Sequence, residues 1–225
     1  MMQYTLRDGL YHCLAGSSVI FLDAQQNRYF AVSATCEAAF LLLKARHGES
    51  FPGAAEALSA LTAGGHLIEC EAGASNFLDV KLCQPVSDVN SYERHQAGPF
   101  TIIQAFYWEA TSFLQLRLLP LSSVLRRATP SSRRTHSPRR EVEKKLAVLL
   151  AGFDYTALAF GIADRCLVRS LAAYSLLRRN RIAAQLVLGV RSAPFGAHAW
   201  VQYEDIVLND TVEQVRSYTP IMVLG

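Results

Sequence analysis

The stretch from Asp164 to Asp210 constrains the fold of this chain more than any other part of its sequence. It opens with "DRCLVRSLAAYSLLRRNRI", in which apolar residues recur every three or four positions, as on one face of an amphipathic helix. The next run, "AAQLVLGV", has the composition of a buried strand, and "FGAHAWVQYEDIVLND" reads as two strands joined by a polar turn. The order is therefore helix, strand, strand, strand, with the first strand in the centre of a sheet.

The hairpin places a histidine and an aspartate within reach of each other. If Tyr203, Glu204 and Asp205 form a three-residue loop, His198 lies directly opposite Asp210 on one face, because side chains alternate faces along a strand. Directly opposed side chains have Cβ atoms about 5 Å apart, and a register change of one residue would separate the pair. A carboxylate beside an imidazole fixes its tautomer and stabilises the imidazolium form.

Cys166 supplies a candidate nucleophile. With Asp164 as the N-cap, Cys166 is the third residue of a helix that Asn180 closes in the left-handed conformation. The free N–H groups and the dipole at a helix N-terminus favour a thiolate there. We therefore interpret Cys166, His198 and Asp210 as nucleophile, proton carrier and orienting carboxylate, with the backbone N–H of Cys166 as an oxyanion donor.

Each of these three residues also has a structural interpretation. A cysteine on an apolar helix is commonly a core residue, a strand histidine is commonly a satisfied polar group, and an aspartate can simply cap the end of a hairpin. The catalytic interpretation depends on the three residues occurring together, at a helix N-terminus and on one hairpin face.

The first 75 residues predict a separate module of winged-helix type. Strand-like runs come first, "LYHCLAG", "SVIFLDA" and "RYFAVS", and a helix through "CEAAFLLLKARHG" follows, capped by Ser33 or Thr35. A second helix through "AAEALSAL" and a short strand, "HLIEC", complete the module. We predict an α+β fold with a small domain at 1–75, a linker at 76–100 and a second domain at 101–225, which begins with helices.

Composition excludes several classes of function. The five cysteines include no C-x-x-C pair, which argues against disulfides and structural zinc and favours a reducing, cytoplasmic setting. The most apolar segment, 99–120, is interrupted by charged and amide side chains, so we expect no membrane span. The arginine-rich "LRRATPSSRRTHSPRR" lacks interleaved aromatic residues, and we interpret it as a solvated loop without a nucleic-acid partner. We expect no metal and no cofactor.

Several blocks of the C-terminal part resemble the B proteins of lasso-peptide biosynthesis, the microcin-maturation leader peptidases: "LQLRLLPLSSVLRR", "RCLVRSLAAYSLLRRNRIAAQLVLGVR", "PFGAHAWVQ" and "VLND". The resemblance implies a papain-like and transglutaminase-like cysteine peptidase domain, with the triad of the family on Cys166, His198 and Asp210. Members of the family often carry a glycine where Asn180–Ile182 lie and a glutamate in place of Gln202. These departures concern a turn and the rim of the site.

The N-terminal module resembles the peptide-recognition element often fused to these peptidases, which is similar to the small chaperone of pyrroloquinoline quinone biosynthesis. The resemblance implies that the leader of a precursor peptide adds as a strand beside "RYFAVS", with Arg28, Tyr29, Phe30 and Val32 as leader contacts. It also implies an asparagine-synthetase-like lasso cyclase as a partner. Two alternatives stay open: a transglutaminase-like acyl transferase with the same triad, and a non-catalytic module that only binds the precursor.

Overall fold

The computed structural model describes residues 3–70, 76–89, 96–128, 139–160 and 165–225, with the backbone alone for 157–160. The chain divides into two compact units, Met1–Val80 and Lys81–Gly225, and each is described by itself. Most of the arginine-rich segment and the expected N-cap Asp164 lie outside the described residues. Within the described residues, no helix has the length and apolar character needed to cross a membrane.

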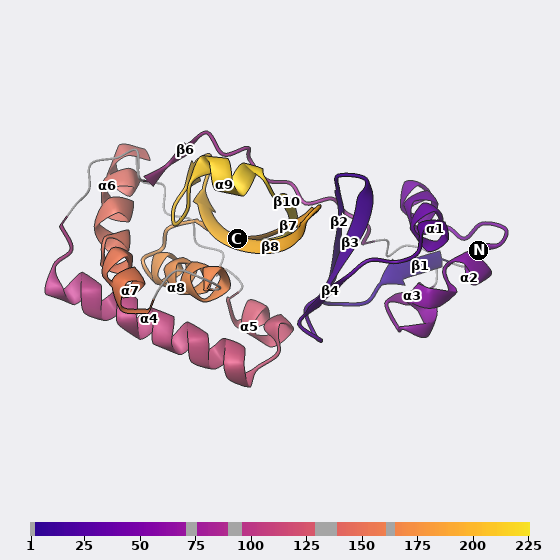
Figure 1. Cartoon of the computed structure of the whole chain (residues 1–225), viewed down its shortest axis with the longest axis horizontal. Helices are drawn as coiled ribbons and strands as arrows, with labels where there is room; N and C mark the ends of the chain where they lie inside the picture. Colours follow the sequence, from indigo (N-terminus) through magenta and orange to yellow (C-terminus); the bar gives the residue numbers. More distant parts are fainter. Residues whose placement is uncertain (1–2, 71–75, 90–95, 129–138, 161–164) are drawn as a thin grey trace. The chain divides into compact units, whose positions relative to one another are not determined.

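The N-terminal unit contains two small antiparallel sheets (Figure 1). One sheet pairs β1 with β5, and the other has the order β2-β3-β4, which leaves β4 at its edge. The strand predictions for β2 to β5 are confirmed, whereas β1 has no counterpart in the sequence prediction. The strands have these bounds: β1 (Gln3–Leu6), β2 (Leu10–Ala15), β3 (Ser18–Asp23), β4 (Arg28–Phe30) and β5 (Leu67–Cys70).

Three helices complete the N-terminal unit: α1 (Ala34–Ala45), α2 (Ala54–Ala57) and α3 (Ser59–Ala63). Helix α1 begins as predicted, because the Ser33 hydroxyl accepts a hydrogen bond from the backbone N–H of Cys36. The prediction of a single second helix is wrong. The chain bends at Leu58, whose side chain is fully buried, and the segment forms two short helices instead.

The C-terminal unit is built on a five-stranded sheet of order β10-β7-β8-β9-β6. Neighbouring strands are antiparallel, except that β6 runs parallel to β9. The apolar run after the long helix is β7 and lies in the interior of the sheet, as predicted. The strands are β6 (Ser87–Asp88), β7 (Gln185–Ser192), β8 (Phe195–Tyr203), β9 (Ile206–Val207) and β10 (Thr219–Leu224).

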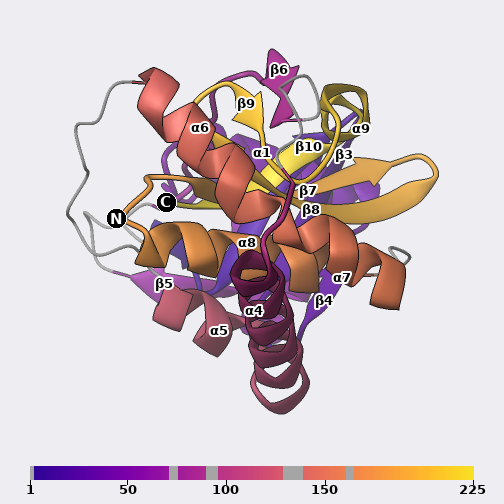
Figure 2. The same cartoon turned by 90° about the vertical axis from the view of Figure 1, so that its left-hand side faces the viewer.

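Helix α8 forms a middle layer between this sheet and the 20-residue helix α4 (Figures 1 and 2). Most of α8 is buried because it has apolar neighbours on both sides, and burying a leucine of this kind is worth about 2 kcal/mol. The helical region that was expected at the start of the second domain is divided, because Leu119 is extended before Pro120. The helices of this unit are α4 (Pro99–Leu118), α5 (Leu121–Ala128), α6 (Arg139–Leu150), α7 (Gly152–Phe160), α8 (Cys166–Arg179) and α9 (Val212–Arg216).

Candidate active site

Cys166 is the first residue of α8, at the end of the middle layer. The expectation that it is the third helical residue is wrong, since Arg165 precedes the helix directly and makes no side-chain cap. The C-terminal expectation is also wrong. Asn180 ends the helix with φ of −84°, and Arg181, with φ of 60°, takes the left-handed conformation. The N-terminal placement of Cys166, which is what favours a thiolate, is retained.

The first turn of α8 lies against the edge of β8. Strand β9 pairs with only Gln202 and Tyr203, so within the described parts of the chain the earlier part of β8 has no strand beside it on that edge. The Ser170 hydroxyl donates a hydrogen bond of 2.8 Å to the carbonyl of Ala199, and the backbone N–H of Ala199 is close enough to Cys166 to help lower the pKa of its thiol. The helix therefore takes the place of a strand and brings Cys166 next to the residue that follows His198.

His198 donates a hydrogen bond through Nε2 to Oδ2 of Asp210. The sequence predicted this contact for the wrong reason. The turn has two residues, Gln202 pairs with Val207 instead of Ile206, and the register is one residue away from the one assumed. The pair nevertheless meets because β9 ends at Val207, after which the chain bends and the alternation of a strand no longer applies.

Asn209 holds this bend in place. Its side-chain oxygen accepts the backbone N–H of Val201 at 2.7 Å, as a strand carbonyl would, and its amide donates to the Ser170 hydroxyl at 2.8 Å. Asn209 directly precedes Asp210, and its side chain thus connects the strand that carries the histidine with the helix that carries the cysteine. Sequence reasoning gave Asn209 and Ser170 no role, although both fall within the motif blocks quoted above.

The electrostatics favour an ion pair between Cys166 and His198. Burial alone opposes protonation of His198, but hydrogen bonds with Asp210 and Cys166 outweigh it and raise the pKa of His198 from 6.5 to about 9. Burial likewise opposes the thiolate, but hydrogen bonds with His198 and with the backbone N–H groups of Ala199 and Leu167 lower the pKa of Cys166. Since Nε2 faces Asp210, Nδ1 is the ring nitrogen left for the sulfur.

Aromatic rings hold the imidazole in its plane. The His198 ring stacks on Tyr218, with 5.0 Å between centroids, and lies 6.2 Å from the ring of Trp200 on its own strand. The position opposite His198 on β7 is Gly189, where a Cβ atom would come within 2.7 Å of the Trp200 ring. The stack therefore requires a residue without a side chain at Gly189.

A buried carboxylate anchors the N-terminus of α8 from the opposite side. Glu109 on α4 is 1% exposed, and its Oε2 lies 3.1 Å from Nη2 of Arg165, the residue before Cys166. Its Oε1 accepts the Thr156 hydroxyl of α7 and lies 4.0 Å from Nε of Arg169. The sequence contains a signal for this contact, because a lone carboxylate in an apolar helix needs a partner when it is buried. In the sequence analysis the same charge was used only to exclude a membrane span.

The four expected leader contacts lie on or just after β4, at the edge of the β2-β3-β4 sheet. Phe30 stacks between Phe21 and His66, and Val32 packs on the same core, so these two side chains help to support the strand. The Arg28 guanidinium is exposed and lies 5.4 Å from the centroid of the Phe30 ring, and Tyr29 is half-buried.

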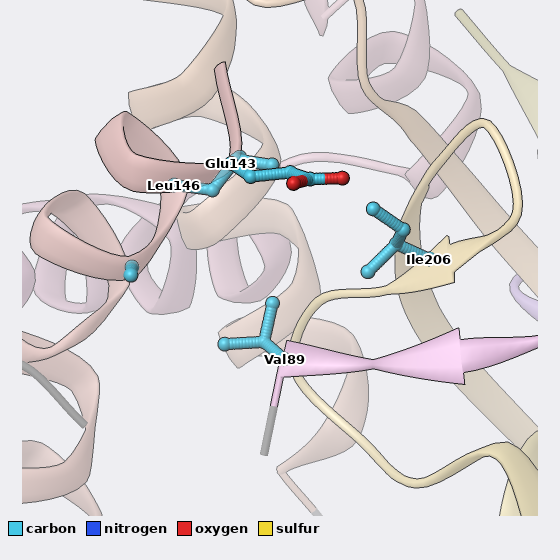
Figure 3. Close-up of a pocket in the computed structure, with 5 residues that line it drawn as sticks. Val89, Glu143, Leu146 and Ile206 are labelled. Carbon is cyan, nitrogen blue, oxygen red and sulfur yellow. The ribbon is translucent and has the colours of Figure 1, made fainter. Parts of the chain in front are cut away.

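The other candidate sites give little indication of function. In the described part of the chain, no three His, Cys, Asp or Glu side chains come together in a way that could hold a metal ion. Figure 3 shows a hollow between α6 and β9 lined by Val89, Glu143, Leu146 and Ile206. Its volume of about 10 Å³ suits one water molecule at most.

Comparison with known protein families gives a match for the C-terminal part of the chain. Residues 111–223 match the model of the transglutaminase-like superfamily, a segment that contains Cys166, His198 and Asp210. Searches among curated proteins and among solved structures find no match.

Proposed function

The chain belongs to the transglutaminase-like superfamily, and from the geometry of its site we propose that it is a cysteine endopeptidase that removes the leader of a ribosomally made lasso-peptide precursor. One observation carries the proposal. His198 hydrogen-bonds the carboxylate of Asp210 through Nε2, and its interaction with Cys166 lowers the pKa of the thiol, which is how a thiol nucleophile is activated and its base oriented.

The proposed reaction proceeds in two steps. The Cys166 thiolate attacks the scissile carbonyl, and the resulting oxyanion is stabilised by backbone N–H groups, among them that of Cys166. The carbon–nitrogen bond then breaks, and the His198 imidazolium gives its proton to the departing amine, which is the N-terminus of the core peptide. In the second step His198 takes a proton from water, whose oxygen displaces the sulfur and releases the leader as a carboxylic acid.

Recognition of the leader is assigned to the N-terminal unit. An edge strand offers unpaired main-chain groups to an added strand, and β4 is such an edge in its three-stranded sheet. In this arrangement Arg28 and Tyr29 contact leader side chains, while Phe30 and Val32 support the strand from the core. The enzyme works in the cytoplasm beside an asparagine-synthetase-like cyclase, which closes the macrolactam with ATP.

Incubation with a precursor peptide and mass spectrometry test the proposal. Wild-type protein is expected to release the leader, Cys166→Ala to release none, and Cys83→Ala, which changes an exposed cysteine outside the site, to remain active. Cleavage by Cys166→Ala would disprove the mechanism. Failure of every protein to cleave, with the precursor still bound, would favour the alternative of a binding module.

The same acyl-enzyme serves an acyl transferase, so hydrolysis has to be distinguished from transfer. In water enriched in oxygen-18, a peptidase adds one labelled oxygen to the C-terminus of the leader. If an added amine such as hydroxylamine at millimolar concentration becomes joined to the leader in preference to water, the protein is a transferase.

A further inference from the structure

The C-terminal unit contains a cavity of about 590 Å³ far from the reacting sulfur. It lies where the C-terminal ends of α5 and α8 meet one face of α4, and its volume falls in the range of ligand sites. Trp108 on α4 and Val124 on α5 contribute apolar surface to its wall. The triad residues do not line it.

The charge of this cavity is strongly one-sided. Among the described residues, its lining includes four arginines and no acidic side chain: Arg127, Arg178, Arg179 and Arg181. Arg178 donates a hydrogen bond of 3.0 Å to the backbone carbonyl of Arg127, which fixes its guanidinium at the wall. None of the ion pairs among the described residues involves Arg127, Arg178 or Arg179. Guanidinium groups in this number select ligands that carry carboxylate or phosphate oxygens.

The helix ends beside the cavity favour an acidic peptide over a compact phosphate. Phosphate sites commonly use a helix N-terminus, where N–H groups point at the anion, but α5 and α8 both end here with their C-termini. The partial negative charge of a helix C-terminus opposes a concentrated anion and attracts N–H donors. An acidic peptide supplies backbone N–H donors together with carboxylates spread along the chain, whereas a phosphate supplies only acceptors.

We propose that this cavity, which we call the arginine exosite, binds an acidic segment of the peptide substrate. The proposal rests on the peptidase function proposed above. Helix α8 rises about 1.5 Å per residue, so the 13 steps from Cys166 to Arg179 place the exosite about 20 Å from the sulfur. An extended peptide covers that distance in about six residues, so the acidic segment lies at least six residues away from the scissile bond.

Binding to a Cys166→Ala protein tests the exosite without any need for cleavage. The probes are a synthetic peptide with four consecutive glutamates, its all-glutamine counterpart and inorganic pyrophosphate, titrated by calorimetry and followed by the fluorescence of Trp108. The glutamate peptide is expected to bind, to change the fluorescence and to bind more weakly as salt is added. The glutamine peptide is expected not to bind.

Two charge-reversed variants locate the site. Arg127→Glu with Arg179→Glu is expected to weaken binding of the glutamate peptide about tenfold or more. The matched control is Arg117→Glu with Arg126→Glu, which makes the same change of net charge at exposed arginines outside the cavity and is expected to change affinity less than twofold. All four positions are exposed, so both variants are expected to fold.

Equal weakening by the two variants, binding of the glutamine peptide, or pyrophosphate that binds more tightly than the glutamate peptide would each overturn the exosite. None of these results concerns the triad, because the readout is binding. Conversely, loss of the peptidase proposal would show as uncleaved precursor in the presence of an intact, peptide-binding exosite.

Discussion

Asp210→Asn is the most informative single change in the site. The substitution keeps the shape of the side chain and removes the negative charge that faces Nε2 of His198. The rise in the pKa of His198 from 6.5 to about 9 corresponds to roughly 3 kcal/mol in favour of the imidazolium form. The Asp210 hydrogen bond is the largest contribution in that direction, so most of this free energy is expected to disappear.

The thiolate is expected to lose its partner together with the proton on His198. In the wild type, we expect the ion pair to exist between the lowered pKa of Cys166 and the pKa of His198 near 9, and we expect Cys166 to react with iodoacetamide throughout this range. In Asp210→Asn the imidazolium is lost at lower pH, and we expect alkylation of Cys166 at pH 6.5 to slow about tenfold to a hundredfold.

The assay follows alkylation from pH 4 to pH 10, with the modified peptide identified by mass spectrometry so that exposed Cys83 is counted separately. Cys83 serves as the internal control, because it is exposed and lies outside the site, so its rate of alkylation is expected to be the same in both proteins. An identical profile for Cys166 in the wild type and in Asp210→Asn would refute the argument that Asp210 sets the charge state of the pair.

Three further substitutions test how the site is held. Gly189→Ala places a Cβ atom 2.7 Å from the Trp200 ring and is expected to reduce the free energy of unfolding, measured in urea, by about 1–3 kcal/mol. The control is Gly98→Ala, where the new Cβ atom has nothing within 4 Å and the free energy of unfolding is expected to stay nearly unchanged. Equal effects of the two substitutions would refute the steric argument. Glu109→Gln removes the buried carboxylate that pairs with the partly buried Arg165 and Arg169, and it is expected to reduce the free energy of unfolding by about 3 kcal/mol. A reduction below about 1 kcal/mol would show that these ion pairs do not anchor the helix. Asn209→Ala removes the acceptor of the Val201 N–H and is expected to reduce the free energy of unfolding by about 1–3 kcal/mol. Asn209→Asp keeps an acceptor oxygen and is expected to recover part of this loss. No recovery would mean that the hydrogen bond to the strand is not the cause.

The pKa of His198 also predicts how stability depends on pH. Because folding raises this pKa above its ordinary value of 6.5, the contribution of His198 is fully present below about pH 6.5 and is lost as the pH rises through about 9. We expect the urea midpoint of the wild type to fall between pH 7 and pH 9.5 by more than that of His198→Gln. Parallel pH profiles of the two proteins would contradict the raised pKa.

The contact between His198 and Asp210 shows how far local reasoning can reach. Strand alternation predicted that the two side chains share a face, but it did so with a three-residue loop and a register that the structure does not have. The residues meet because β9 is two residues long and Asn209 turns the chain after it. Strand alternation does not predict where a strand ends, since the end of β9 depends on hydrogen bonds of Asn209 with other elements.

The contacts that anchor the helix of Cys166 could not be predicted from the sequence for a different reason. Glu109 lies more than fifty positions from Arg165, and nothing in either local pattern states that α4 and α8 pack together. A buried carboxylate in an apolar helix signals that a partner exists, but only packing selects the partner. Three of the four exosite arginines lie together at the end of α8, but Arg127 of α5 joins them only because α5 and α8 end at the same place.

The amino-acid sequence by itself determined the helix and the strands around the site, the interior position of β7 and the residue types on which the chemistry depends. Periodicity and turn residues are local properties, and they carry this information without any contact between distant elements. Tertiary structure alone decided the register of the hairpin, the start of α8 at Cys166, the role of Asn209 and the burial of Glu109. Each of these depends on hydrogen bonds or ion pairs between segments that the chain brings together only on folding.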